Sequence, residues 1–129
     1  MEYRRRNARE LYRCFLDLAK ARGIRVVLYS LPSPIDGFYL GDRNRWPNGL
    51  IVLEKKLKIR ERVWVLAHEL GHYFMDKVLN IEIGNIFLKS VTDEDKKRRV
   101  QIEAEADDFA RWLITVYGGD EAYFPPKRS

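Results

Sequence analysis

Residues 63–75 read VWVLAHELGHYFM, an apolar stretch that contains both histidines of the chain. His68 and His72 lie four residues apart, and on an α-helix such residues share one face. Two imidazoles placed there can both reach one Zn²⁺ ion at about 2.0–2.1 Å. Glu69 projects beside the metal, where it can take a proton from a water molecule without becoming a ligand. The spacing therefore predicts a zinc site on a helix, with Glu69 as the general base.

The same spacing on an exposed helix would be only a charged patch with i,i+4 contacts. Two features of the stretch count against that interpretation. Apolar residues flank the motif on both sides, and buried His and Glu side chains need partners, because unpaired polar burial is costly. Gly71 costs about 1 kcal/mol relative to Ala within a helix, but its missing side chain lets another element or the metal site approach closely. We therefore favour the metal site.

The length of 129 residues predicts a single domain over residues 1–129. No apolar run approaches the 18 residues of a membrane span, so we expect no membrane contact. Cys14 is the only cysteine and is interpreted as a small core residue; without a disulfide, a cytoplasmic location is expected. The net charge is +5, but no nucleic-acid-binding motif accompanies the basic residues, and direct nucleic-acid binding is not expected.

Hydrophobic periodicity predicts an α+β fold with a core over about residues 8–117. The expected helices span residues 8–22, 59–77 and 95–117, and the expected strands span 24–29, 37–40 and 50–54. Short connections suggest a small three-stranded antiparallel sheet packed on about three main helices. Residues 41–49 are expected to form a turn, 78–89 a loop with a short helix, and 125–129 a Pro-rich loose tail after a basic N-terminus.

The third zinc ligand must be a carboxylate, because the chain has no third histidine and no second cysteine. Candidates lie in the acidic stretch 103–108 of the last predicted helix. Glu103 and Glu105 flank its apolar stripe at similar angles, so helical geometry does not choose between them. Asp107 follows Glu103 by four residues and could orient an imidazole. An acidic surface with helical charge pairs is the alternative interpretation of the stretch.

Taken together, the H-E-L-G-H motif and the sequence EAEADDFA at residues 103–110 resemble the ImmA/IrrE family of metallopeptidases. That resemblance implies a minimal zincin-like metalloprotease domain with one Zn²⁺ per chain. It implies His68, His72 and Glu103 as metal ligands, Glu69 as general base and Asp107 as an outer partner. The residues after Ala110 depart from the family's usual ending and leave the adjacent substrate wall undefined.

The expected activity is zinc-dependent hydrolysis of a peptide bond in a protein substrate. The resemblance implies that this substrate is a DNA-binding helix-turn-helix repressor. The alternative is a zinc-stabilised regulatory module that binds a repressor or antitoxin without cleaving it. An exposed sheet edge could hold an extended substrate. Tyr39, Tyr73 and Arg111 are candidates, by residue type alone, for an electrophile beside the metal. The sequence gives no oligomeric state.

Overall fold

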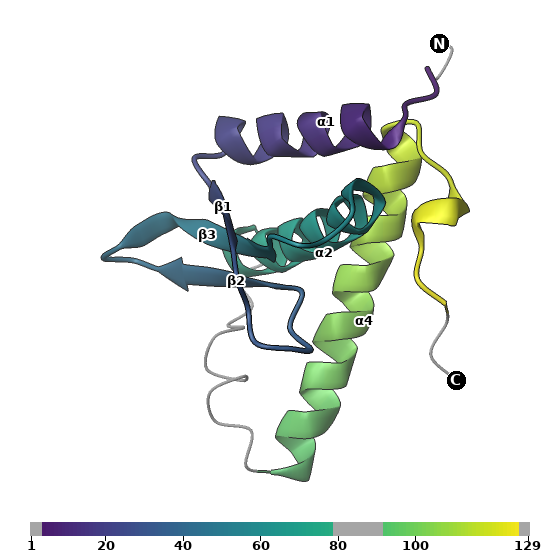
Figure 1. Ribbon diagram of the computed structural model, residues 1–129. Helices are drawn as coiled ribbons and strands as arrows, with labels where there is room; N and C mark the ends of the chain where they lie inside the picture. The colour runs from purple at the N-terminus through teal and green to yellow at the C-terminus, as the bar shows by residue number, and fades with distance from the viewer. Residues whose placement is uncertain (1–3, 79–91, 127–129) are drawn as a thin grey trace.

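The computed structural model describes residues 4–78 and 92–126 and has the α+β architecture that the sequence predicts (Figure 1). Three helices and a three-stranded sheet follow one another along the described chain. In order they are α1 (Ala8–Ala21), β1 (Arg25–Tyr29), β2 (Gly37–Asp42), β3 (Trp46–Glu54), α2 (Ile59–Lys77), α4 (Asp93–Val116) and the short 3₁₀ helix η1 (Glu121–Tyr123). Helix α2 lies at the centre, in contact with the sheet, α1 and α4.

The sheet is mixed, and the prediction of a purely antiparallel sheet is wrong. The strand order is β1-β3-β2, with β1 parallel and β2 antiparallel to β3. Strand β3 takes the central position because its run Ile51–Leu53 is buried throughout, whereas β1 and β2 are mostly exposed or half-buried. After β1 the chain forms β2 at the opposite edge of the sheet, and it then returns as β3 between β1 and β2.

The predicted turn over residues 41–49 is also wrong in extent. The turn is confined to residues 43–45, because Asp42 ends β2 and Trp46 begins β3. The Asp42 side chain accepts hydrogen bonds from the backbone N–H groups of Asn44 (2.9 Å) and Arg45 (3.3 Å). This local capping tightens the connection, so the residues after it pair with β2 instead of forming a loop.

One hydrophobic core fills the space between α1, α2, the sheet and the end of α4. Helix α1 begins with a capping box between Asn7 and Glu10 and buries a stripe at i, i+4 spacing, Leu11, Phe15 and Ala19. The central strand contributes Ile51 and Leu53 from its inner face. Cys14 is half-buried and packs against this core, as predicted.

Helices α2 and α4 approach closely at Gly71. A Cβ atom on Gly71 would lie 3.2 Å from the Cα and the carbonyl oxygen of Ala106 and 3.3 Å from the Cβ of Phe109. The prediction that this glycine admits a neighbouring element is confirmed. Helix α4 begins two residues earlier than predicted because Thr92 caps it through Asp95 N–H, at 3.1 Å. The close approach sets the distance between the acidic residues of α4 and the histidines of α2.

The C-terminal segment after α4 turns back along the helices. Phe124 packs against Trp64 of α2 with a ring-centroid distance of 5.9 Å, and Arg60 lies 4.7 Å over the ring of Tyr123. No helix within the described residues is long and apolar enough to cross a membrane. The loop with a short helix predicted over residues 78–89 lies, except for Val78, outside the described chain, which omits residues 79–91 and 127–129.

Candidate metal centre

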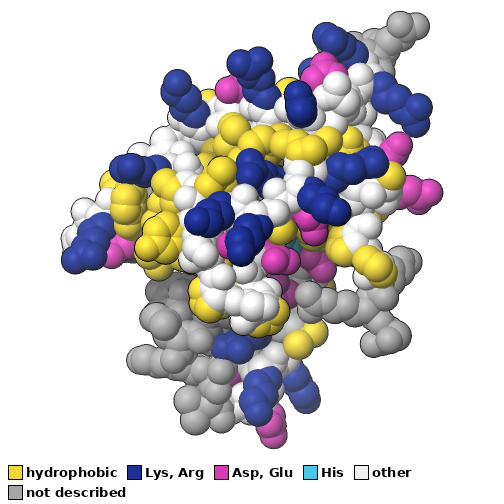
Figure 2. Space-filling model, in the orientation of Figure 1, with side chains coloured by type: hydrophobic (Ala, Val, Ile, Leu, Met, Phe, Trp, Pro, Cys, Tyr) yellow, Lys and Arg dark blue, Asp and Glu magenta, His cyan; other side chains and the backbone are white. Residues whose placement is uncertain are grey.

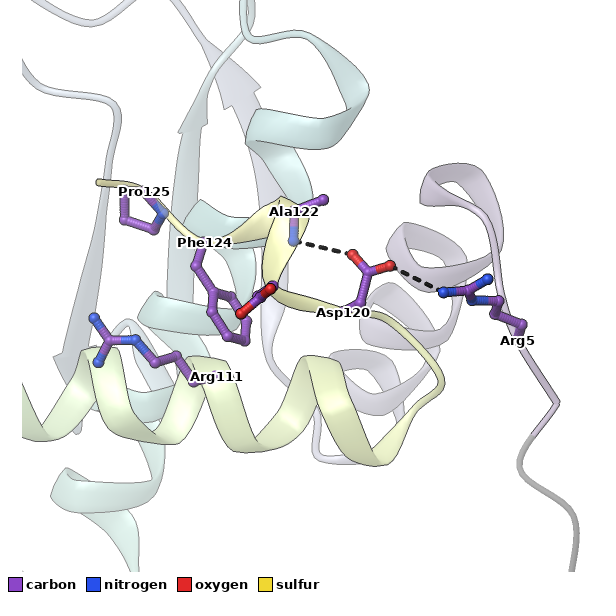
Figure 3. A pocket seen from close by; sticks show the side chains of 7 residues that line it. Arg5, Arg111, Asp120, Ala122, Phe124 and Pro125 are labelled. Carbon is purple, nitrogen blue, oxygen red and sulfur yellow. Dashed lines mark hydrogen bonds and ion pairs between the residues drawn. The ribbon is translucent and has the colours of Figure 1, made fainter. Parts of the chain in front are cut away.

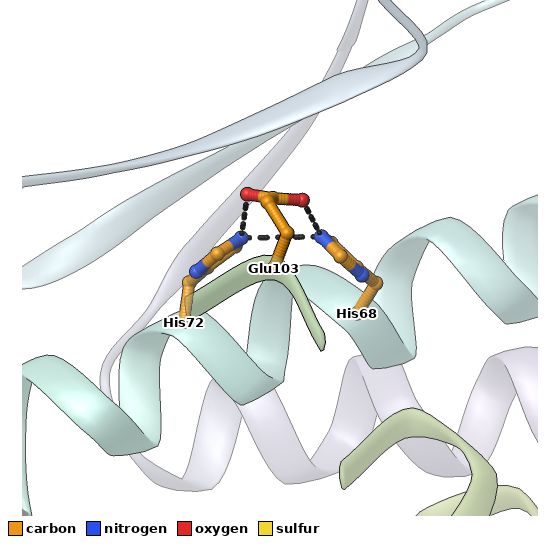
Figure 4. A group of neighbouring side chains, drawn as sticks. All are labelled: His68, His72 and Glu103. Atoms are coloured by element: carbon orange, nitrogen blue, oxygen red, sulfur yellow. Dashed lines mark hydrogen bonds and ion pairs between the residues drawn. The ribbon is translucent and has the colours of Figure 1, made fainter. Parts of the chain in front are cut away.

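The two histidines point from one face of α2 toward a common position (Figure 4). Their Nε2 atoms are 3.1 Å apart, and the rings meet edge to face with centroids 4.8 Å apart. The side chain of His68 is 13% exposed and that of His72 is 5% exposed. Helix α2 thus provides a pair of imidazole nitrogens that are largely shielded from water.

Glu103 reaches between the two rings from α4. Its Oε2 lies 2.9 Å from His68 Nε2 and its Oε1 lies 3.0 Å from His72 Nε2. Within the described residues, His68, His72 and Glu103 form the one group of potential metal ligands. Glu105 is exposed and lies about 200° further around α4. The structure therefore places Glu103, and not Glu105, at the site.

Asp107 contacts the imidazole of His68, as expected for the residue that the sequence suggested could orient an imidazole. His68 Nδ1 lies 2.7 Å from Asp107 Oδ1, so the Nδ1–H donates to this carboxylate. A hydrogen bond at Nδ1 fixes the tautomer of the neutral ring that presents its Nε2 lone pair to the common position. Asp107 and Glu103 occupy the same face of α4 because they are separated by four residues.

The donor set fits a tetrahedral divalent metal ion such as zinc. Two imidazole nitrogens and a carboxylate oxygen are ligands that zinc accepts with one coordination position left open. Ligands at about 2.0–2.1 Å around a tetrahedral ion lie about 3.3 Å from one another. The separations of 2.9–3.1 Å among the three side chains are close to that value. Small adjustments would admit the ion.

The electrostatics of the three side chains favour an ion pair between His68 and Glu103. Burial alone would lower the pKa of His68, but its hydrogen bond with Glu103 and the charges of Glu69, Glu103 and Asp107 raise it to about 9. Burial opposes ionisation of Glu103, yet hydrogen bonds from His68 and His72 keep its pKa well below the usual range. A protonated His68 therefore offsets part of the negative charge of the carboxylates, in a position where a cation is stabilised.

Glu69 differs from the other carboxylates of the site because its side chain is almost completely buried. Its exposed fraction is 6%, and this burial raises the pKa of its carboxyl group, although His68 and His72 act in the opposite direction. A raised pKa brings a carboxylate closer to the range in which it both accepts and returns a proton near neutral pH. Its environment thus suits a general base, whereas Glu103 is held ionised.

Strand β2 lies along the helix beside the histidines. Gly37 approaches Val65 of α2. Two residues further along the strand, the hydroxyl of Tyr39 donates to Asp76 Oδ2 at 2.6 Å. The sequence analysis missed this role of Asp76. A signal was present, since Asp76 continues the four-residue spacing of His68 and His72 along one face of α2.

Strand β2 is the edge strand of the described sheet, and it contacts α2 at Val65 and Asp76. Leu66 is fully buried and Val65 contacts Gly37 of β2; with about 100° of rotation per residue, His68 lies about 60° beyond Val65, on the side away from Leu66. Acidic side chains gather between α2 and α4 in the space-filling view and are surrounded by Lys and Arg (Figure 2). Within the described residues, the candidate metal centre is thus bordered by α4 and by the side of α2 that faces the edge strand β2.

The three electrophile candidates have other contacts. Burial and the hydrogen bond to Asp76 raise the pKa of Tyr39 far above its usual range. Tyr73 is 6% exposed and packs edge-on against Tyr39 with centroids 6.1 Å apart. Arg111 binds Asp108 at 3.0 Å and stacks near Trp64. Their assignment as an electrophile stays a prediction.

A separate pocket of about 720 Å³ lies beside the C-terminal segment (Figure 3). The Arg5–Asp120 ion pair, at 3.4 Å, lies at one end, and the guanidinium of Arg111 lies at the other. Two basic and two acidic side chains line it, Arg5, Arg111, Asp120 and Glu121. None of the three potential metal ligands contributes to its wall.

The fold and the metal centre together define a metallopeptidase-type domain, in which a small sheet covers a helix that supplies two imidazoles and a buried carboxylate. Sequence comparison places the chain within that class. The model of the Peptidase M78 family, described as the IrrE N-terminal-like domain, matches residues 19–128, and the chain belongs to this family. No curated protein and no solved structure matches it. The resemblance to the ImmA/IrrE family is thereby confirmed.

Proposed function

We propose that this protein is a zinc-dependent endopeptidase that hydrolyses one peptide bond in a protein substrate. The observation that carries the proposal is the convergence of His68, His72 and Glu103 beside the buried carboxyl group of Glu69. Membership of a peptidase family supports the same conclusion. A bound zinc ion would polarise the scissile carbonyl and acidify the attacking water.

The residues of the chain then have separate tasks. Glu69 accepts the proton of the attacking water and delivers it to the leaving amine. Asp107 holds the ring of His68 in the orientation that presents Nε2. The free edge of β2 hydrogen-bonds an extended substrate segment and lays its backbone beside the histidines.

The proposed substrate is a helix-turn-helix transcriptional repressor. The resemblance to the ImmA/IrrE family supports this choice. The alternative is a module that binds such a repressor through a zinc-stabilised surface without cutting it. A buried Glu69 with a raised pKa favours hydrolysis, because a purely structural site needs no general base.

The test combines zinc-loaded protein with a repressor encoded beside its gene and follows the products by mass spectrometry. Wild type is expected to yield two fragments from a single cleavage, and Glu69→Gln, which keeps all three ligands, is expected to yield none. Elemental analysis should find about one zinc per chain in both proteins. Stable binding without fragments in wild type would support the alternative function instead.

A further inference from the structure

Two rows of side chains cross the outer face of the sheet, the face turned away from α2. A Cβ on Gly37 would lie 2.7 Å from Val65, and Tyr39 binds Asp76, so both residues of β2 face α2. Successive residues of a strand point to opposite faces. Phe38 and Leu40 therefore point to the outer face.

Each row consists of residues that lie opposite one another on the three strands, and each ends in an apolar side chain on the edge strand β2. Phe38 lies opposite Val52, and Val52 lies opposite Val27. Phe38 is 39% exposed although it is a large apolar side chain on an outer strand. Figure 2 shows hydrophobic side chains gathered over the strands at the left of the view.

The second row is asymmetric. Leu40 lies opposite Leu50, which lies opposite Arg25 on β1. Leu40 is 43% exposed at the β2 end of this row, whereas its β1 end carries a cation that stacks 5.5 Å from the ring of Trp46. Charged residues protect a strand edge from pairing with other chains, and exposed apolar residues invite it. In this row the apolar end is therefore the β2 edge, on the side of α2 that carries His68.

We infer that Phe38 and Leu40 are specificity-determining residues that select a substrate segment with two apolar side chains spaced two residues apart. A strand paired with β2 directs alternate side chains to the outer face, where they extend the two rows. β-Branched and aromatic side chains are the best cross-strand neighbours for Phe and Leu. This inference rests on the proposed function.

The experiment presents a library of unstructured ten-residue peptides to the zinc-loaded protein and sequences the cleaved products. Wild type is expected to prefer Val, Ile, Phe or Tyr over Ser or Glu at two positions two residues apart. The preference at each position should be about 1.4-fold to fivefold, the range of one cross-strand pair. Phe38→Thr and Leu40→Thr should each remove the preference at one of the two positions. Threonine keeps the strand propensity of the site.

The matched control is Tyr29→Thr on β1, because Tyr29 is 67% exposed and alternation places it on the outer face with Val27. It should leave the cleavage profile unchanged. Cleavage with no paired apolar preference, or a preference that survives both variants, would overturn the inference and leave the peptidase function intact. If wild type cleaves nothing, the same peptides are tested for binding to Glu69→Gln. The paired preference in binding supports the inference without hydrolysis, and its absence there contradicts it.

Discussion

Glu69 stands out at the scale of single residues because the fold removes its carboxyl group from water. Replacing it with Gln keeps the size of the side chain and removes the proton acceptor. We expect turnover to fall by about 10²–10⁴-fold, the usual contribution of a general base, while the zinc content stays unchanged. Residual turnover above about a tenth of wild type, at equal zinc content, would show that another group accepts the proton.

His68 makes metal affinity depend on pH. Its pKa rises from the ordinary 6.5 to about 9 in the folded metal-free protein, so protonation stabilises that form fully below pH 6.5 and less as the pH rises through 9. Zinc needs the neutral ring, and binding must displace this proton at neutral pH. We therefore expect affinity to rise about tenfold per pH unit between pH 6.5 and 8.5.

Competition with a chromophoric chelator across that pH range measures the slope. The comparison is His68→Ala, because it keeps Glu69 and His72 and so shows how zinc affinity depends on pH through the remaining groups of the site. A pH-independent zinc affinity in wild type would contradict a protonated His68 in the metal-free protein.

Asp107 is expected to act on the metal through His68. Asp107→Ala removes the acceptor that lies 2.7 Å from His68 Nδ1. Loss of such an outer partner weakens metal binding by about 10–100-fold. Zinc titration measures the change, and Asp108→Ala, an exposed neighbour whose carboxylate binds Arg111, is the matched control. Equal effects of the two substitutions would point to a general loss of negative charge.

The residues on α2 were predictable because their relation is local. Four-residue spacing fixes one helix face whatever the tertiary structure, so His68, Glu69 and His72 followed from the sequence. Glu103 and Glu105 were not separable on that basis, since both flank the apolar stripe of α4. The close contact at Gly71 decides which side of α4 meets the histidines, and that contact is tertiary.

At the scale of elements, helices were predicted better than the sheet. Helix α2 spans the residues predicted for it. Its apolar pattern marks the helix, and the backbone N–H of Lys58 donates to the Glu61 side chain at its start. The sheet order was missed because three short strands with short connections are compatible with more than one pairing. The unbroken apolar run Leu50–Leu53 was the available signal, since continuous burial marks a central strand.

Gly71 links the packing of α2 and α4 to the metal centre. Gly71→Val would push its side chain into the backbone of Ala106 and separate the two helices. Overpacking of this kind costs about 1–3 kcal/mol of unfolding free energy. Urea denaturation measures that loss, and zinc titration should show weaker binding because Glu103 moves with α4. Ala104→Val on the exposed face of α4 controls for the lower helix propensity of valine. Unchanged zinc affinity in Gly71→Val would show that the ligands do not depend on this contact.

For the molecule as a whole, a bound metal would join two helices that otherwise meet through packing, of Gly71 against Ala106 and of Phe74 against Phe109. A ligand that binds only the folded state stabilises it by about 4 kcal/mol at a free concentration of 1,000 times Kd. We therefore expect chelation to lower Tm by at least several degrees, as followed by circular dichroism. Glu103→Ala should show a smaller difference between zinc-loaded and chelated samples. An equal difference in both proteins would mean that Glu103 contributes nothing to binding.

The division of the ligands between α2 and α4 also orders the assembly of the protein. His68 and His72 are neighbours on one helix, so this half of the centre exists as soon as α2 is helical. Glu103 joins only after α4 has docked on α2, and bringing two distant parts of the chain together costs conformational entropy. An ion held by the two imidazoles would attract the carboxylate and offset part of that entropy. Metal uptake during synthesis would then precede, and help to nucleate, the docking of α4.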